Sequence, residues 1–206
     1  YPDQFIPVLE KNGYVIDVDN FIWNKVCACI KMMEDKGIEP VPISVNVSRM
    51  HVYQEKFTEN LKNMAGEYGI DPKYIPLEIT ESAFTKEEGS LFKKVQSLQG
   101  YGFKFSMDDF GSGYSSLGML KSERVDEVKI DKTFVDDIAT DKGKVLLGNV
   151  IRMINELGID MIAEGVETKE QADFLKENGC MYAQGYYYYK PMPIEEFAKL
   201  LENSAR

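Results

Sequence analysis

Polar side chains that can bind a metal ion or move a proton recur at the ends of short apolar segments in this sequence. In chain order they are Asn46, Glu78, Asp108, Lys129, Glu164 and Gln184. Carboxylate and amide oxygens without histidine or cysteine suit hard cations such as Mg2+, Mn2+ or Ca2+ rather than zinc. Asp109 adds a carboxylate beside Asp108, and such a pair can bridge two ions about 3.5 to 4 Å apart, an arrangement that cleaves phosphoesters.

Three other features admit more than one interpretation. A lysine at an inward strand position needs an anion beside it, so Lys129 is expected to hold a phosphate oxygen or to orient a water between carboxylates. The single histidine, His51, is interpreted as a surface or capping residue rather than a base or ligand. The tyrosines at 186–189 are expected to pack within a strand, although Tyr186 or Tyr188 could stack on a base.

Strands and helices are expected to alternate along the chain. Segments rich in β-branched residues predict strands at 43–48, 76–82, 104–110, 127–131, 161–166 and 182–189. Helical periodicity predicts helices at 20–36, 53–68, 87–99, 144–157, 169–178 and 194–201, the first with Ile22, Val26, Ile30 and Met33 on one face. Thr85 and Thr168, each followed three residues later by Glu or Gln, fit capping boxes at helix starts.

This alternation predicts an α/β fold with a parallel sheet, either doubly wound or closed as a barrel. A dinucleotide-type doubly wound fold would show Gly-x-Gly-x-x-Gly after an early strand, and the sequence has none, so a TIM-type (β/α) barrel is preferred. A complete barrel has eight strands and about 250 residues. We therefore expect one continuous domain over residues 1–206, N-terminally incomplete and missing one or two strands.

In such a barrel the last inward residue of each strand points into the mouth where active sites lie. Each polar strand end taken alone could equally cap the next helix, but six together favour one shared site. Adjacent strand residues point to opposite faces, and Gly111 and Gly113 are expected to let the chain bend so that both Asp108 and Asp109 reach the mouth.

Composition narrows the class of protein. Lys and Arg number 24 against 34 Asp and Glu, a net charge of -10, which counts against binding a DNA or RNA backbone. No apolar run approaches the roughly 20 residues of a membrane span, so no membrane contact by this domain is expected. Cys27, Cys29 and Cys180 lack Cys-x-x-Cys spacing. A zinc site and a disulfide framework are therefore disfavoured, and a cytoplasmic location is expected.

Seven short motifs span almost the whole chain. They are PDQFIP at 2–7 with Glu10, SVNVS at 44–48, LEITES at 77–82, DDFGSGYSSL at 108–117, KID at 129–131, AEGVE at 163–167, and QGY at 184–186 with Lys190 and Pro191. In this order they resemble the EAL domain, a bacterial phosphodiesterase family that acts on cyclic di-GMP. The resemblance implies an EAL-like barrel that opens one 3'-5' phosphodiester to give linear pGpG in second-messenger signalling.

The resemblance also implies roles for residues. Metal-site roles fall on Asn46, Glu78, Asp108, Asp109, Glu164 and Gln184, with Mg2+ or Mn2+ as cofactor and Ca2+ as inhibitor. Lys129, Asp108 and Asp109 would help deprotonate the attacking water, and Glu167 would support the catalytic site. Glu81 would anchor the loop at 109–116, and contacts to substrate would come from Tyr186, Lys190 and Pro191.

The implied partners are cyclic di-GMP, a second copy of the domain in a homodimer, and a GGDEF or sensory domain in the parent protein. The Glu-Ala-Leu segment that names the family, whose glutamate binds metal, is absent from this sequence. We therefore expect the chain as written to bind Mg2+ weakly and to hydrolyse slowly or not at all. Two alternatives stay open: a non-hydrolysing cyclic di-GMP receptor, and a metal-dependent barrel enzyme with another substrate.

Overall fold

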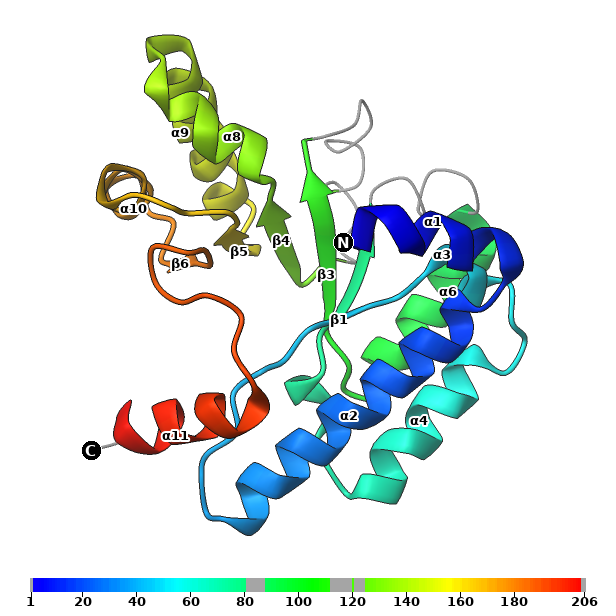
Figure 1. The fold of residues 1–206 in the computed structure, drawn as a ribbon. Helices are drawn as coiled ribbons and strands as arrows, with labels where there is room; N and C mark the ends of the chain where they lie inside the picture. Colours follow the sequence, from blue (N-terminus) through cyan, green and yellow to red (C-terminus); the bar gives the residue numbers. More distant parts are fainter. Residues whose placement is uncertain (1, 81–87, 112–119, 121–124, 205–206) are drawn as a thin grey trace. The chain divides into compact units, whose positions relative to one another are not determined.

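The computed structural model describes residues 2–80, 88–111, 120 and 125–204. Helices alternate with six β-strands along this part of the chain (Figure 1). The chain forms two compact units: unit 1 contains Tyr1–Ile79, Glu87–Lys104 and Met192–Arg206, and unit 2 contains Thr80–Lys86 and Phe105–Pro191. That residues 1–206 act as one continuous domain stays a prediction.

Unit 1 is mainly helical around two parallel strands. Its helices are α1 (Pro2–Asn12), α2 (Val15–Asp35), α3 (Arg49–Val52), α4 (Phe57–Tyr68), α6 (Glu88–Gln99) and α11 (Ile194–Ser204), with a short 3-10 helix at Pro72–Tyr74. Strand β1 (Val45–Asn46) pairs in parallel with β2 (Leu77–Thr80), and this pairing sets Asn46 opposite Glu78. Figure 1 shows α2 and α4 side by side, and the two helices are in contact.

Helix α2 buries one stripe of side chains in the core of unit 1. The stripe recurs every three or four residues and consists of Val15, Asp19, Trp23, Cys27, Ile30 and Met33, with Cys29 buried beside it. The predicted face was wrong at its start, because Ile22 is 44% exposed whereas Trp23 is 2% exposed. The stripe can contain Asp19 and the Trp23 indole because both find hydrogen-bond partners inside unit 1.

Unit 2 is a parallel sheet with its helices packed against it. Strands β3 (Phe105–Phe110), β4 (Glu127–Ile130), β5 (Asp160–Ala163) and β6 (Tyr182–Ala183) pair in that order, all parallel. The helices are α8 (Lys132–Asp136), a 3-10 helix η2 (Asp137–Ala139), α9 (Asp141–Glu156) and α10 (Lys169–Glu177). The core joins Val128 and Ile130 of β4 to Leu147, Ile151 and Ile154 of α9.

All six predicted strands and the six predicted helices are present, with shorter strands than expected. Helices α1, α3 and α8 were not predicted. The strand predicted at 182–189 was wrong beyond Ala183, because the backbone N–H groups of Tyr188 and Tyr189 both donate to the Gly185 carbonyl and form a turn. The capping box at Thr168 is confirmed, whereas Thr85 and Gly113 lie outside the described residues.

Among the described residues, no helix has the length and apolar character needed to cross a membrane.

Replacement of two glycines in α9 by alanine should change the stability of the protein in opposite directions. A Cβ at Gly143 would overlap the backbone carbonyl of Asp137, whereas at Gly148 its nearest neighbour would be the exposed Asn178 side chain at 3.1 Å. Alanine gains about 1 kcal/mol over glycine in a helix, but overpacking against backbone costs about 1 to 3 kcal/mol. We expect Gly148→Ala to raise the melting temperature and Gly143→Ala to lower it, as followed by circular dichroism. Equal stabilisation by both substitutions would contradict the close approach of Gly143 to the Asp137 carbonyl in η2.

Candidate functional site

Three carboxylates gather at the strand ends of unit 2. One oxygen each from Asp108 and Asp109 on β3, and from Glu164 directly after β5, all lie within 4.8 Å of one another. All three residues are partly buried. Like charges this close disfavour each other unless a cation lies among them. The arrangement therefore offers oxygen ligands that suit a hard divalent cation.

The backbone of β3 explains how two consecutive aspartates reach one cluster. In a regular strand their side chains would point to opposite faces. Asp109 instead has a φ of 56°, and no other described residue except glycine has a positive φ. The β3–β4 register also shifts between Met107 and Phe110. The sequence argument assigned the bend to glycines, and Gly111 does have a φ of 98°, but the turn begins at Asp109 itself.

Lys129 lies among these carboxylates. It comes from β4, between β3 and β5, and is 6% exposed. Its Nζ is 2.5 Å from Glu164 Oε1 and 3.6 Å from Asp108 Oδ1. Gln184 Nε2, after β6, donates to the same Glu164 oxygen at 2.6 Å. Glu164 is thus held from both neighbouring strands.

The predicted ligands Asn46 and Glu78 belong to unit 1. They are register partners on adjacent parallel strands, so their side chains leave the same face at the same level. Glu78 is buried at 5% exposure, whereas Asn46 is exposed.

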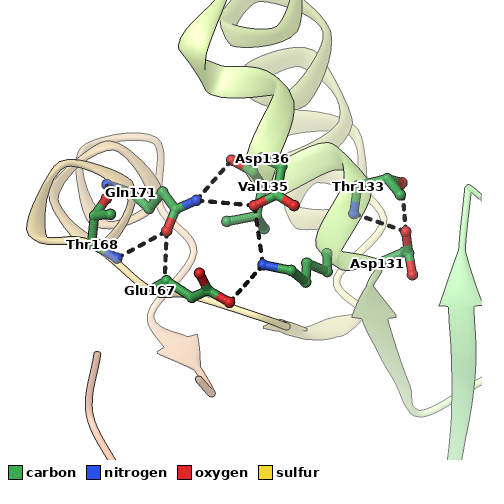
Figure 2. A network of polar contacts seen from close by, with 8 residues as sticks. Asp131, Thr133, Val135, Asp136, Glu167, Thr168 and Gln171 are labelled. Atoms are coloured by element: carbon green, nitrogen blue, oxygen red, sulfur yellow. Dashed lines mark hydrogen bonds and ion pairs between the residues drawn. The ribbon is translucent and has the colours of Figure 1, made fainter. Parts of the chain in front are cut away.

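Polar contacts fix the segment that follows β5 onto α8 (Figure 2). Gln171 Oε1 accepts from the backbone N–H groups of Glu167 at 2.7 Å and Thr168 at 3.0 Å. Its Nε2 donates to the Val135 carbonyl and to Asp136 Oδ1, as the dashed lines in Figure 2 show. Gln171 therefore ties the segment carrying Glu164 to the helix that follows β4.

Lys132 of α8 also bonds the segment that follows β5. Its Nζ donates to Glu167 Oε1 at 2.9 Å and to Asp136 at 3.2 Å. The hydrogen bond to Glu167 is the main reason that the pKa of Lys132 is raised. A Cβ at Gly165, where φ is 67°, would overlap the Lys132 side chain. The Glu167 carboxylate thus faces α8, where it supports the segment after Glu164.

Sequence reasoning missed Lys132 and the second role of Gln171. The capping box at Thr168 located Gln171, and its reciprocal bonds are present. Nothing in that local pattern indicates that the amide also reaches α8, because this contact joins residues 35 and 36 positions apart.

Three further predicted site residues follow β6, and one lies outside the described residues. Tyr186 is 61% exposed, with Lys190 Nζ 5.5 Å from its ring centroid, and Pro191 is also exposed. Glu81 lies outside the described residues. The surface position expected for His51 was wrong, since it is 1% exposed and packs among aromatic rings of unit 1.

The three cysteines are free and buried. Burial raises the pKa of Cys27 to about 11 and also raises the pKa values of Cys29 and Cys180. Because the thiolate is the metal ligand and nucleophile, a Cys27 thiol that stays protonated at neutral pH is poorly suited to either role.

Comparison with known proteins places the chain in a family. Residues 1–191 match the EAL domain. The chain belongs to the EAL domain family. It is 34% identical over 201 residues to the signaling protein YkoW of Bacillus subtilis, covering 97% of this chain and 25% of that protein. It is 33% identical over 201 residues to the probable cyclic di-GMP phosphodiesterase PdeG of Escherichia coli, covering 97% and 40% respectively.

A solved structure shows the same fold. The PaMucR phosphodiesterase in complex with c-di-GMP superimposes with a TM-score of 0.89 at 30% identity, over 95% of this chain and 80% of that one. The α/β barrel expected of an EAL domain is therefore confirmed as the fold class. The chain spans only 25% and 40% of the length of the two curated relatives.

The Gln171 contacts predict a measurable loss of stability. Gln171→Ala removes the acceptor of the Glu167 and Thr168 N–H groups, which belong partly to the capping box, and the donor to the buried Val135 carbonyl. Loss of a capping contact costs about 0.5 to 2 kcal/mol, so we expect the free energy of unfolding, measured by urea titration, to fall by about 1 to 2 kcal/mol. Lys176→Ala, at an exposed position of the same helix, should change it by less than about 0.5 kcal/mol. An unchanged midpoint for Gln171→Ala would show that the segment after β5 is held by other contacts.

Proposed function

We propose that this EAL domain hydrolyses cyclic di-GMP to linear pGpG with Mg2+ or Mn2+ as cofactor. The observation that carries the proposal is the cluster of Asp108, Asp109 and Glu164 around the buried Lys129. The substrate is supported by PdeG, named a probable cyclic di-GMP phosphodiesterase, and by PaMucR, a phosphodiesterase solved in complex with c-di-GMP.

The donor set of unit 2 fits a divalent cation. Asp108, Asp109 and Glu164 would hold it, with Gln184 beside them and with Asn46 and Glu78 of unit 1 as further proposed ligands. Carboxylate and amide oxygens are the ligands that Mg2+ and Mn2+ take in proteins. A bound divalent cation would neutralise charge on the phosphate and make a water molecule more acidic.

The residues themselves supply proton transfer and orientation. Asp108 would accept the proton of the attacking water as a general base. Lys129, 3.6 Å from Asp108 and 2.5 Å from Glu164, would donate a hydrogen bond to that water between the two carboxylates. Attack on phosphorus forms a new P–O bond and breaks the bond to the 3' oxygen. That oxygen leaves with a proton, so one water is consumed for each pGpG formed.

The setting of the domain is also a proposal. Since the chain spans a minor part of YkoW and PdeG, we infer that it works beside a GGDEF or sensory domain. We also propose that it acts as a homodimer in the cytoplasm, as the family resemblance implies. A receptor that binds cyclic di-GMP without cleaving it is the alternative. Incubation of the full-length protein with cyclic di-GMP and Mn2+, followed by mass spectrometry, separates the two, because only hydrolysis yields pGpG.

Removal of a proton acceptor or a proposed ligand should affect turnover far more than folding. In the full-length protein we expect Asp108→Ala or Glu78→Ala to lower kcat by about 10²- to 10⁴-fold. Lys129→Ala should do the same if its ammonium orients the water. Asp173→Asn, which changes an exposed carboxylate on α10, serves as the matched control. Near-normal pGpG formation by Asp108→Ala would show that the Asp108 carboxylate has no part in the mechanism.

Metal binding gives a second, independent measurement. Replacing a carboxylate ligand by its amide keeps the shape and removes the charge, so Asp109→Asn and Glu164→Gln should each weaken Mn2+ binding at least about tenfold. Titration calorimetry or the electron paramagnetic resonance signal of free Mn2+ reports the affinity. A chelator should abolish turnover, and Mn2+ should restore it. Unchanged affinity in both variants would place the cation elsewhere.

A further inference from the structure

A buried acid–histidine pair in unit 1 has no part in the proposed chemistry. Asp19 is 7% exposed and His51 is 1% exposed, with His51 Nε2 3.2 Å from Asp19 Oδ2. Buried polar groups bond to other polar groups, so the neighbours of these two side chains show what they hold in place.

What the pair holds is the end of β1. The β1–β2 ladder uses the N–H groups of Val45 and Val47, which donate to Pro76 and Glu78 at 2.9 Å. The carbonyl of Asn46 and the N–H of Ser48 point away from β2. Trp23 Nε1 donates to the Asn46 carbonyl at 3.0 Å, and Asp19 Oδ2 accepts from the Ser48 N–H at 3.1 Å.

Two side chains of α2 thus bond the backbone groups of β1 that point away from β2. Here the Trp23 indole is the donor and the Asp19 carboxylate is the acceptor. The two lie four positions apart, on one face of α2.

His51 contacts both of these side chains. It lies on α3, whose first turn is capped by Ser48. Its ring centroid is 4.4 Å from that of Trp23 and 5.7 Å from that of Phe57, and its Nε2 contacts the same Asp19 oxygen that Ser48 uses.

The orientation of Asn46 depends on this backbone. Val45 and Val47 are buried at 2% and 5% exposure, whereas Asn46 between them is exposed. A rotation or slip of the strand by one residue would exchange the two faces. Because β1 is only two residues long, its own ladder supplies few bonds against such a change.

We propose that Asp19, Trp23 and His51 are positioning residues that fix the direction of the Asn46 side chain. The inference rests on the proposed function, because Asn46 matters as a proposed ligand of its cation. Residues that orient a metal ligand typically contribute about 10- to 100-fold in metal affinity.

The test compares variants of the full-length protein by three measurements: the Mn2+ dissociation constant, kcat and KM for cyclic di-GMP, and amide hydrogen exchange of Val47. Asp19→Ala and Trp23→Phe should raise the Mn2+ dissociation constant about 10- to 100-fold. They should lower kcat more than they raise KM, and should speed exchange at Val47. Asp19→Asn, which keeps an acceptor oxygen, should restore affinity to within about threefold of the wild type.

Met33→Ala is the control for general destabilisation. Met33 is buried in the same stripe, ten residues beyond Trp23 or about 15 Å along the helix. It should lower the urea midpoint while leaving Mn2+ affinity and Val47 exchange unchanged. If it weakens Mn2+ binding as much as Trp23→Phe at an equal loss of stability, the positioning role is wrong.

Two further outcomes separate this inference from the proposed function. Weaker Mn2+ binding in Asn46→Ala, with unchanged affinity and exchange in Asp19→Ala and Trp23→Phe, would overturn the inference and leave the proposed function standing. Equal Mn2+ affinity in the wild type and Asn46→Ala would also overturn it, and pGpG formation by the wild type would then decide the proposed function separately.

Discussion

A buried ammonium group requires anions around it, and in unit 2 this requirement links the ends of three strands. Lys129 of β4 lies between Asp108 of β3 and Glu164 after β5. The three clustered carboxylates and one ammonium formally leave two negative charges. One divalent cation would balance them, whereas a second lysine would balance only half. The charge of the cluster thus agrees with its oxygen chemistry.

Backbone strain at the cluster is balanced by the contacts around it. A residue other than glycine in the left-handed region, such as Asp109, costs about 1 to 3 kcal/mol and persists only where its surroundings impose it. Here the regular pairing of β4 with β5 fixes the neighbouring strands, and Gln171 of α10 and Lys132 of α8 fix the segment after β5. The strain brings a second carboxylate to the cluster that a regular strand would turn away.

The sequence predicted those parts of the site that depend on local pattern. Polar residues that end apolar segments were found without a structure, because strand periodicity and chain order are local. The φ of Asp109 and the reach of Gln171 depend on pairing with distant segments. The tyrosines at 186–189 were misplaced because aromatic residues favour strands in general. On α2, the spacing of apolar residues placed Ile22 on the buried face. Asp19 and Trp23 are buried instead, because hydrogen-bond partners elsewhere in unit 1 satisfy their polar atoms.

Both units hold candidate ligands by the same physical means. In unit 1 the side chains of α2 bond the backbone on either side of Val47, and in unit 2 the Gln171 amide of α10 bonds the backbone after Glu164. Each helix is itself fixed by buried side chains, among them Ile30 on α2 and Leu175 on α10. Core packing thereby determines where a strand-end oxygen lies. A site supported in this way is preorganised by rigid elements rather than by the loops that carry its ligands.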